Sequence, residues 1–334
     1  MKAIGYTQIG GPEVLTDITI EKPGAGPRDL VVQVKAISVN PVDTKVRKGA
    51  APQDGQAKVI GYDAAGIVVE VGSEVSLFKV GDEVFYCGTS NRQGTNSEFH
   101  AVDERIVGRK PTSLSFAEAA ALPLTALTAW ELLFDRLRVP YGAKTLGGAI
   151  LVINGAGGVG SILIQLARRL TGLTVIASTS RPETKDWVSK MGSHHVVNHR
   201  KALDVEVRAL GINHVEYVAG LTDTDKHLSE IVEIIAPQGS LSLIDDGSLD
   251  IGKLKPKSVT VSWEMVFTRP LFETPDMIRQ HQILNEVSAL VDAGVLKTTM
   301  TTDFGPINAD NLKKAHEHLE TGKTIGKVVL NGFA

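Results

Sequence analysis

The sequence predicts an α/β protein of two domains, one rich in β-strands and the other built on a doubly wound parallel sheet. Three observations support this prediction. The 334 residues exceed what one hydrophobic core usually serves. Short apolar segments separated by glycine turns fill the first third of the chain. Residues 149–244 then alternate buried strands with amphipathic helices.

The first third of the chain has the pattern of a small irregular barrel. Residues 1–6 and 30–39 read as strands, and apolar side chains in the second alternate with Gln33 and Lys35. Further strands are expected at 66–71 and 84–86, where Gly-Ser and Gly-Asp turns separate them.

Helical signals begin near residue 115 and return in the tail. Ser115 and Glu118 form a capping box that starts a helix, which Pro123 interrupts. In the tail, Thr274 followed by proline predicts the start of a helix that Gly294 ends. A second helix is expected near 308–320 and a last strand at 327–330. We assign residues 1–124 and 272–334 to the β-rich domain and residues 125–271 to the other.

A glycine-rich turn marks a dinucleotide site. Gly155, Gly157 and Gly160 match the pattern G-x-G-x-x-G, and the two residues between the last glycines are Gly158 and Val159. A buried strand at 149–154 precedes the turn and an amphipathic helix to about residue 170 follows, which is the context that this motif requires. The free N–H groups at such a helix start suit a pyrophosphate.

The end of the next strand, residues 173–178, selects the cofactor. NAD sites usually carry an acid there, whereas this chain has Ser178, Ser180 and Arg181, with Lys185 one turn later. Hydroxyls and a guanidinium suit a 2′-phosphate, so the sequence predicts NADPH. In the alternative, Arg181 and Lys185 are solvated charges, and Glu183 pairs with either of them.

Several motifs in order resemble the medium-chain dehydrogenase/reductase superfamily over the whole chain, in particular its quinone oxidoreductase branch and the zinc-type alcohol dehydrogenase-like proteins. The matching segments are Gly10–Leu15, Asn40–Asp43, Gly61–Gly66, Val80–Val84 and Asn154–Gly160. The resemblance implies a GroES-like catalytic domain around a central Rossmann domain, with the active site in the cleft between them. It also implies that Asn40 and Thr128 contact cofactor or substrate.

The zinc ligands of the family are missing. Zinc-dependent members have cysteine where Asn40 stands and histidine where Tyr62 stands, and Cys87 is the one cysteine of the chain. A catalytic zinc needs three protein ligands, so we expect none here. Tyr62 then points toward the vacated site, either as a hydrogen-bond donor to the substrate or as packing alone. Some quinone reductases have a tyrosine where this chain has Ala51.

The sequence therefore predicts a zinc-independent reductase that passes hydride from NADPH to a quinone or an α,β-unsaturated carbonyl. Conjugated acceptors are the easier substrates without a metal. The alternatives are an alcohol dehydrogenase and a non-catalytic NADPH-binding protein. A net charge of −3 gives no reason to expect nucleic acid or membrane as a partner. The lone cysteine fits the cytoplasm. The alternating segment 258–266 predicts a homodimer through an edge strand, or else an internal strand.

Overall fold

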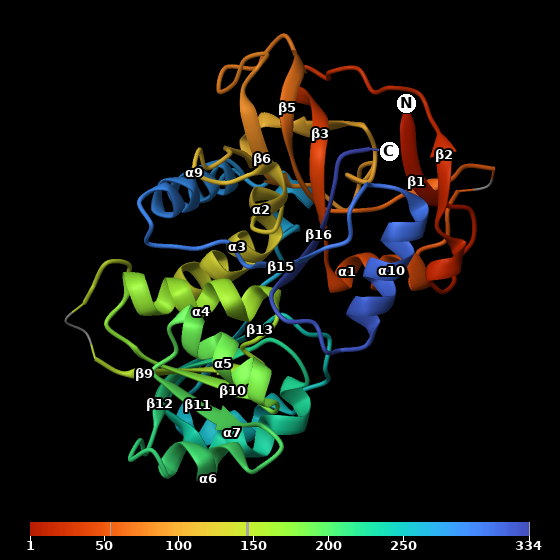
Figure 1. Cartoon of the computed structure of the whole chain (residues 1–334). Helices are drawn as coiled ribbons and strands as arrows, with labels where there is room; N and C mark the ends of the chain where they lie inside the picture. The colour runs from red at the N-terminus through yellow and green to blue at the C-terminus, as the bar shows by residue number, and fades with distance from the viewer. Residues whose placement is uncertain (54, 145–146, 334) are drawn as a thin grey trace. The chain divides into compact units, whose positions relative to one another are not determined.

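Two segments of the chain, far apart in sequence, build one unit, and the segment between them builds another (Figure 1). The computed structural model describes residues 1–53, 55–144 and 147–333. The first unit contains Met1–Leu127 and Phe267–Ala334, of which Ala334 lies outside the described residues. The second unit contains Thr128–Val266.

The first unit contains two β-sheets. A small antiparallel sheet has the order β2-β1-β4, from Thr16–Thr19, Lys2–Tyr6 and Lys58–Val59. A seven-stranded sheet has the order β15-β16-β3-β5-β6-β8, and β7 pairs with β3. Its strands are β15 (Met300–Asp303), β16 (Lys327–Asn331), β3 (Asp29–Val39), β5 (Asp63–Val71), β6 (Glu83–Cys87), β8 (Val107–Arg109) and β7 (Phe99–Asp103). The predicted β-rich domain is confirmed.

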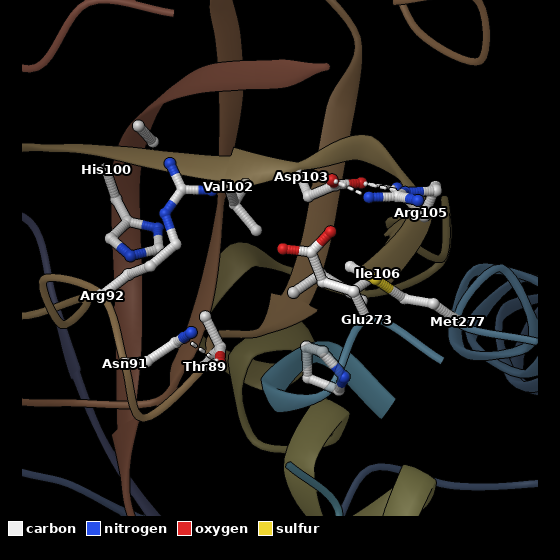
Figure 2. A pocket seen from close by; sticks show the side chains of 12 residues that line it. Thr89, Asn91, Arg92, His100, Val102, Asp103, Arg105, Ile106, Glu273 and Met277 are labelled. Atoms are coloured by element: carbon white, nitrogen blue, oxygen red, sulfur yellow. Dashed lines mark hydrogen bonds and ion pairs between the residues drawn. The ribbon is translucent and has the colours of Figure 1, made fainter. Parts of the chain in front are cut away.

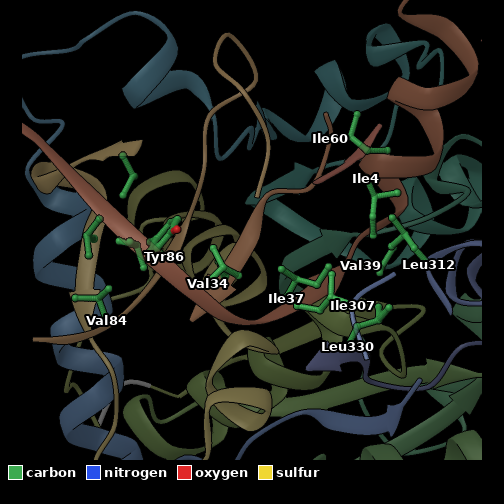
Figure 3. Packing of buried hydrophobic residues seen from close by; sticks show 14 of the residues in the cluster. Ile4, Val34, Ile37, Val39, Ile60, Val84, Tyr86, Ile307, Leu312 and Leu330 are labelled. Carbon is green, nitrogen blue, oxygen red and sulfur yellow. The ribbon is translucent and has the colours of Figure 1, made fainter. Parts of the chain in front are cut away.

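Strand β3 is the centre of the larger sheet, because it pairs with β5, β7 and β16. Its apolar side chains enter a core shared with the other strands and with α10, as Figure 3 shows for Ile37, Tyr86, Leu312 and Leu330. The pairing brings the start of β16, near the end of the chain, against the end of β3. This register positions the buried side chains described below.

Among the described residues, three helices of the first unit begin after a residue of the capping type, Asn40, Ser115 or Asn308, and two begin after Phe267 or Ile278, which provide no side-chain cap. They are α1 (Pro41–Gly49), α2 (Phe116–Ala120), α8 (Thr268–Leu271), α9 (Arg279–Asp292) and α10 (Ala309–Glu320), with short 3₁₀ turns at η1 (Pro12–Val14) and η2 (Glu104–Ile106). Ser115 and Glu118 form both bonds of the predicted capping box before α2. Helix α3 (Pro123–Trp130) begins at the proline that was predicted to interrupt the helix.

The predicted start of α9 at Thr274 is wrong. The Thr274 hydroxyl donates to the Asp276 carboxylate at 2.7 Å, and that carboxylate also pairs with Arg269. These contacts hold the segment in turns, so the helix begins at Arg279. Its end agrees with the prediction, since Gly294 follows the last turn at a φ of 70°.

The second unit is a parallel sheet with the order β11-β10-β9-β12-β13-β14, which confirms the predicted Rossmann-like sheet. Its strands are β11 (His195–Asn198), β10 (Thr174–Thr179), β9 (Ala149–Ile153), β12 (Val215–Gly220), β13 (Ile235–Leu243) and β14 (Thr260–Trp263). Its helices are α4 (Gly158–Leu170), α5 (Pro182–Met191), α6 (Leu203–Arg208) and α7 (Leu228–Ile234), with η3 (Glu131–Arg136), η4 (Thr224–His227) and η5 (Ile251–Lys257).

One helical stretch, Phe116–Arg136, is long and apolar enough to cross a membrane by length and composition alone. In its most apolar window, 83% of the residues are buried inside the protein. This stretch therefore has the burial of a core helix.

Candidate functional site

The glycine-rich turn joins β9 to α4 in the second unit, and its glycines differ in their surroundings. A Cβ atom on Gly155 would lie 3.0 Å from the Ala177 Cβ, and one on Gly160 would lie 2.4 Å from the Gly155 carbonyl oxygen. A Cβ on Gly157 would meet no described heavy atom within 4 Å. Glycine is thus required by packing at Gly160 and is tightly packed at Gly155, whereas Gly157 leaves the backbone open to a ligand.

Helix α4 presents its first N–H groups without a side-chain cap. Its N-cap residue is Gly157, which has no side chain that could accept from the amides of the first turn, where Gly158 and Val159 lie. The helix has 13 residues, so its dipole adds partial positive charge at this end. These features suit the phosphate groups of a dinucleotide.

Ser178 fixes this turn from the neighbouring strand. Its hydroxyl oxygen accepts from the backbone N–H of Asn154 at 2.9 Å and lies 3.3 Å from Nδ1 of His199. Asn154 has a φ of 60°, a left-handed conformation that asparagine adopts more readily than most residues. Ser178 is fully buried, so the structure engages its hydroxyl in holding the turn.

The other predicted phosphate contacts follow β10 in sequence. Ser180 is half-buried, Arg181 is the N-cap residue of α5, and Lys185 is exposed on that helix. The Arg181 guanidinium lies 3.1 Å from the Glu183 carboxylate, and about a quarter of its side chain is exposed. A phosphate at this edge would compete with Glu183 for Arg181.

A buried polar network surrounds Asn40 in the first unit. The Asn40 amide nitrogen donates to Asp63 Oδ2 at 2.8 Å, and its amide oxygen accepts from the Lys327 ammonium at 2.5 Å. That ammonium also donates to the Val39 carbonyl at 3.0 Å and to Asp63 at 3.2 Å. The Ser38 hydroxyl donates to the same carboxylate oxygen at 2.8 Å. Both ends of the Asn40 side chain are therefore held.

The second oxygen of Asp63 anchors a helix. It accepts from the backbone N–H of Leu124 at 2.7 Å, in the first turn of α3. Thr128 lies one turn further along the same helix and is 5% exposed. An acid at a helix start is favourable because the first N–H groups have no partner within the helix.

Tyr62 immediately precedes β5 and is 3% exposed. Its ring packs against Phe267, with centroids 4.8 Å apart and an interplanar angle of 54°. Its hydroxyl has no hydrogen-bond partner in residues 1–53, 55–144 and 147–333. Burial raises the pKa of the phenol, and the nearby Asp43 carboxylate raises this pKa further. Tyr62 therefore keeps its proton near neutral pH and can donate it to a hydrogen bond.

Asp43 caps the start of α1. One carboxylate oxygen accepts from the Asn40 backbone N–H at 2.6 Å, and the other is buried without a partner in the described part of the chain. Burial raises the pKa of Asp43 to about 7, against which the Asn40 N–H bond and the Lys327 charge act to lower it. Asp43 thus holds the Asn40 backbone and changes charge near neutral pH.

These side chains do not suit a zinc ion. The Asn40 amide oxygen already accepts from Lys327, and a divalent cation beside that ammonium would be repelled. Tyr62 keeps its proton, and a neutral phenol is a poor zinc ligand. Among the residues that the structure describes, no three His, Cys, Asp or Glu side chains are grouped to hold a metal ion.

A small pocket in the first unit is lined by residues other than those described above (Figure 2). Its volume is about 70 Å³, and β7, the turn before it and residues 270–277 form its walls. Arg92 pairs with Asp29 at 2.7 Å, and Arg105 pairs with Asp103 at 2.7 Å. Its arginines therefore already have carboxylate partners, and no predicted site residue is among the described lining residues.

Sequence reasoning missed Asp63, Lys327 and the buried state of Asp43. Asp63 lies inside a motif that was used only for its resemblance, and Lys327 begins an apolar strand. A lysine at the start of a buried strand is itself a signal, because lysine is almost never fully buried unless paired. Its partner lies 264 residues away, so the pairing has no local signature.

Comparison with known proteins agrees with this architecture. Residues 26–131 match the model of the alcohol dehydrogenase GroES-like domain, and residues 191–330 match that of a zinc-binding dehydrogenase. A zinc-type alcohol dehydrogenase-like protein of Staphylococcus aureus is 42% identical over 93% of this chain and 92% of its own length. The NADPH-dependent alkenal/one oxidoreductase of Arabidopsis thaliana is 31% identical over 99% of this chain and 79% of its own length.

Solved structures are also similar to this chain. A protein of Rhizobium etli, assigned to the zinc-dependent alcohol dehydrogenases, is 56% identical with a TM-score of 0.95, covering 100% of this chain and 98% of that one. The quinone oxidoreductase of Escherichia coli, complexed with NADPH, is 26% identical with a TM-score of 0.82, covering 99% and 100%. With its GroES-like strands, its parallel sheet and its glycine turn, the chain belongs to the medium-chain dehydrogenase/reductase superfamily of oxidoreductases.

Proposed function

We propose that this protein is a zinc-independent reductase that transfers hydride from NADPH to a quinone or an α,β-unsaturated carbonyl. The observation that carries the proposal is the hydrogen bonding and protonation of Asn40 and Tyr62, which stand where zinc-dependent members have metal ligands. Asn40 is bonded at both ends to Lys327 and Asp63, and Tyr62 offers a neutral hydroxyl that has no partner among the described residues. The site supplies a hydrogen-bond donor in place of a metal.

NADPH, when bound, would supply the hydride, and negative charge would then develop on the carbonyl oxygen of the acceptor. The Tyr62 hydroxyl donates a hydrogen bond to that oxygen. Because the pKa of Tyr62 is raised by burial, the donor stays protonated throughout the working pH range. One such donor is typically worth about 10²–10³ in rate. The apolar Phe267 ring beside Tyr62 suits a planar conjugated substrate.

The preference for NADPH rests on the residues after β10. Ser180, Arg181 and Lys185 provide a hydroxyl and two cations for the 2′-phosphate, and Ser178 supports the adjoining turn from within. The name of the Arabidopsis relative and the ligand of the Escherichia coli structure, NADPH in both cases, support this choice. The uncapped start of α4 would hold the pyrophosphate.

A panel of acceptors tests the proposal. NADPH and NADH oxidation are followed with a model quinone, a model enone, a saturated aldehyde and a saturated ketone. We expect turnover with the quinone or the enone, faster with NADPH, and little with the saturated carbonyls. Turnover confined to saturated carbonyls would indicate an alcohol dehydrogenase. Binding of NADPH without turnover of any acceptor would indicate a non-catalytic binding protein.

A further inference from the structure

We propose that Lys327 is a positioning residue for this reduction, because its buried ammonium fixes the Asn40 side chain and, through Asp63, the segment that carries Tyr62. The inference rests on the proposed function for its effect on turnover. The arrangement it describes, a single orientation of the Asn40 amide, is testable without activity.

The bonds of Lys327 account for all of its donors. Its three N–H groups have three acceptors, namely the Val39 carbonyl, the Asn40 amide oxygen and Asp63 Oδ2. The side chain is 3% exposed. An ammonium with every donor used inside the protein has no donor left for a substrate, so Lys327 acts through its neighbours.

The orientation of Asn40 follows from this arrangement. An amide side chain has two orientations that differ by exchanging oxygen and nitrogen. With the oxygen toward Lys327 and the nitrogen toward Asp63, each end faces a group of the opposite polarity. The reversed amide would place its N–H groups against the ammonium and its oxygen against the carboxylate. The charges of Lys327 and Asp63 therefore select one orientation.

Asp63 transmits the same constraint to the chain around it. Its carboxylate accepts from Ser38, Asn40 and Lys327 through one oxygen and from the Leu124 N–H through the other. Asp63 is the first residue of β5, directly after Tyr62. A carboxylate that accepts four bonds fixes the backbone at Asp63. It therefore also fixes the backbone position from which the Tyr62 side chain extends.

Without the ammonium, a buried carboxylate would lack its counter-ion, and a single substitution would alter folding as well as position. The double variant Asp63→Asn with Lys327→Met removes both charges together. Its two neutral side chains would no longer orient the Asn40 amide by charge, while the buried volume changes little. The double variant therefore removes the ammonium without leaving an unpaired buried carboxylate.

The experiment compares wild type, Lys327→Met, the double variant and the surface control Lys314→Met. NADPH affinity is measured by fluorescence titration, and kcat and KM with the best acceptor. We expect the double variant to bind NADPH within about twofold of wild type while kcat falls by about 10- to 100-fold. Lys314→Met should match wild type. A folded double variant with wild-type kcat would overturn the proposal.

A second readout does not depend on turnover. Selective ¹⁵N labelling of asparagine reports the Asn40 side-chain amide protons, assigned by their loss in Asn40→Asp. In wild type we expect two resolved, slowly exchanging protons, and in the double variant we expect fast exchange. Unchanged protons in the double variant would show that Lys327 does not set the amide. If wild type has no reductase activity, but its Asn40 amide protons exchange slowly and those of the double variant exchange fast, the proposed function fails and the positioning role of Lys327 stands.

Discussion

Tyr62 and Asp43 are among the ionisable side chains buried in the first unit, and burial raises the pKa of each. For the phenol, the result is a permanently neutral donor. For the carboxyl, the result is a group whose charge changes near neutral pH. The negative charge of the Asp43 carboxylate also raises the pKa of Tyr62, so protonation of Asp43 makes the environment of Tyr62 less negative.

Replacing Tyr62 by phenylalanine removes the hydroxyl and keeps the ring that packs on Phe267. We expect Tyr62→Phe to lower kcat by about 10²–10³, because the developing oxyanion loses its donor. Steady-state rates with the best acceptor measure this loss, and Tyr217→Phe, on a half-buried tyrosine of the second unit, is the control. Full turnover in Tyr62→Phe would make Tyr62 a packing residue.

Asp43 should make stability depend on pH. Its pKa rises from 3.8 to about 7 on folding, so the folded protein holds a proton that the unfolded chain loses. The stabilisation is present below pH 4 and is lost as the pH rises toward 7. Asp43→Asn can still accept from the Asn40 N–H. Relative to wild type, we expect this variant to gain up to about 4 kcal/mol between pH 4 and 8. Urea unfolding at several pH values measures the difference, and a constant difference would contradict the assignment.

Arg181 is the residue on which cofactor choice depends most directly. We expect Arg181→Ala to weaken NADPH binding by about one to two decades and to leave NADH nearly unchanged, because a charge-assisted contact to phosphate is worth roughly 1.5–3 kcal/mol. Fluorescence titration with both cofactors measures this, with Lys190→Ala on the exposed face of α5 as the control. Equal losses for both cofactors would place Arg181 away from the 2′-phosphate.

At the scale of elements, the sequence predicted most strands and helices because their signals are local. The Ser115 capping box and the Gly155 turn each lie within six residues, and both appear where they were expected. The start of α9 was not predictable in this way, because the Thr274 hydroxyl bonds to Asp276, which Arg269 also holds. Arg269 lies outside the pattern of Thr274 followed by proline, so this pattern alone could not reveal the competing contact.

Strand β14 is the element on which assembly depends. It ends the six-stranded sheet, and Trp263, its last residue, and Met265, two residues later, are each 53% exposed. Such an edge favours pairing with a second copy through a two-fold axis, so we expect a dimer of the 35.7 kDa chain in light scattering at micromolar concentration. Trp263→Lys should shift the population to monomers, whereas Phe272→Lys, at an exposed site outside this strand, should not. A monomeric wild type would rule this out.

For the molecule as a whole, the resemblance of several motifs, in order, to those of a known family was sufficient to predict the superfamily, but not the buried network of the site. Asn40 and Tyr62 stood out in the sequence because they differ from the metal ligands of relatives. Lys327 did not, since the fold alone brings it to Asp63 across 264 residues. The sequence thus indicated which groups are missing from the site, and the structure shows which groups hold its remaining side chains.

The central claim is that the reduction proceeds without zinc. The most direct test is NADPH oxidation with a quinone and an enone, before and after treatment with a strong chelator, with the zinc content of both samples measured. We predict the same turnover in the two samples and a zinc content well below one ion per chain in each. Activity that is lost with the metal and restored by adding zinc would contradict the account.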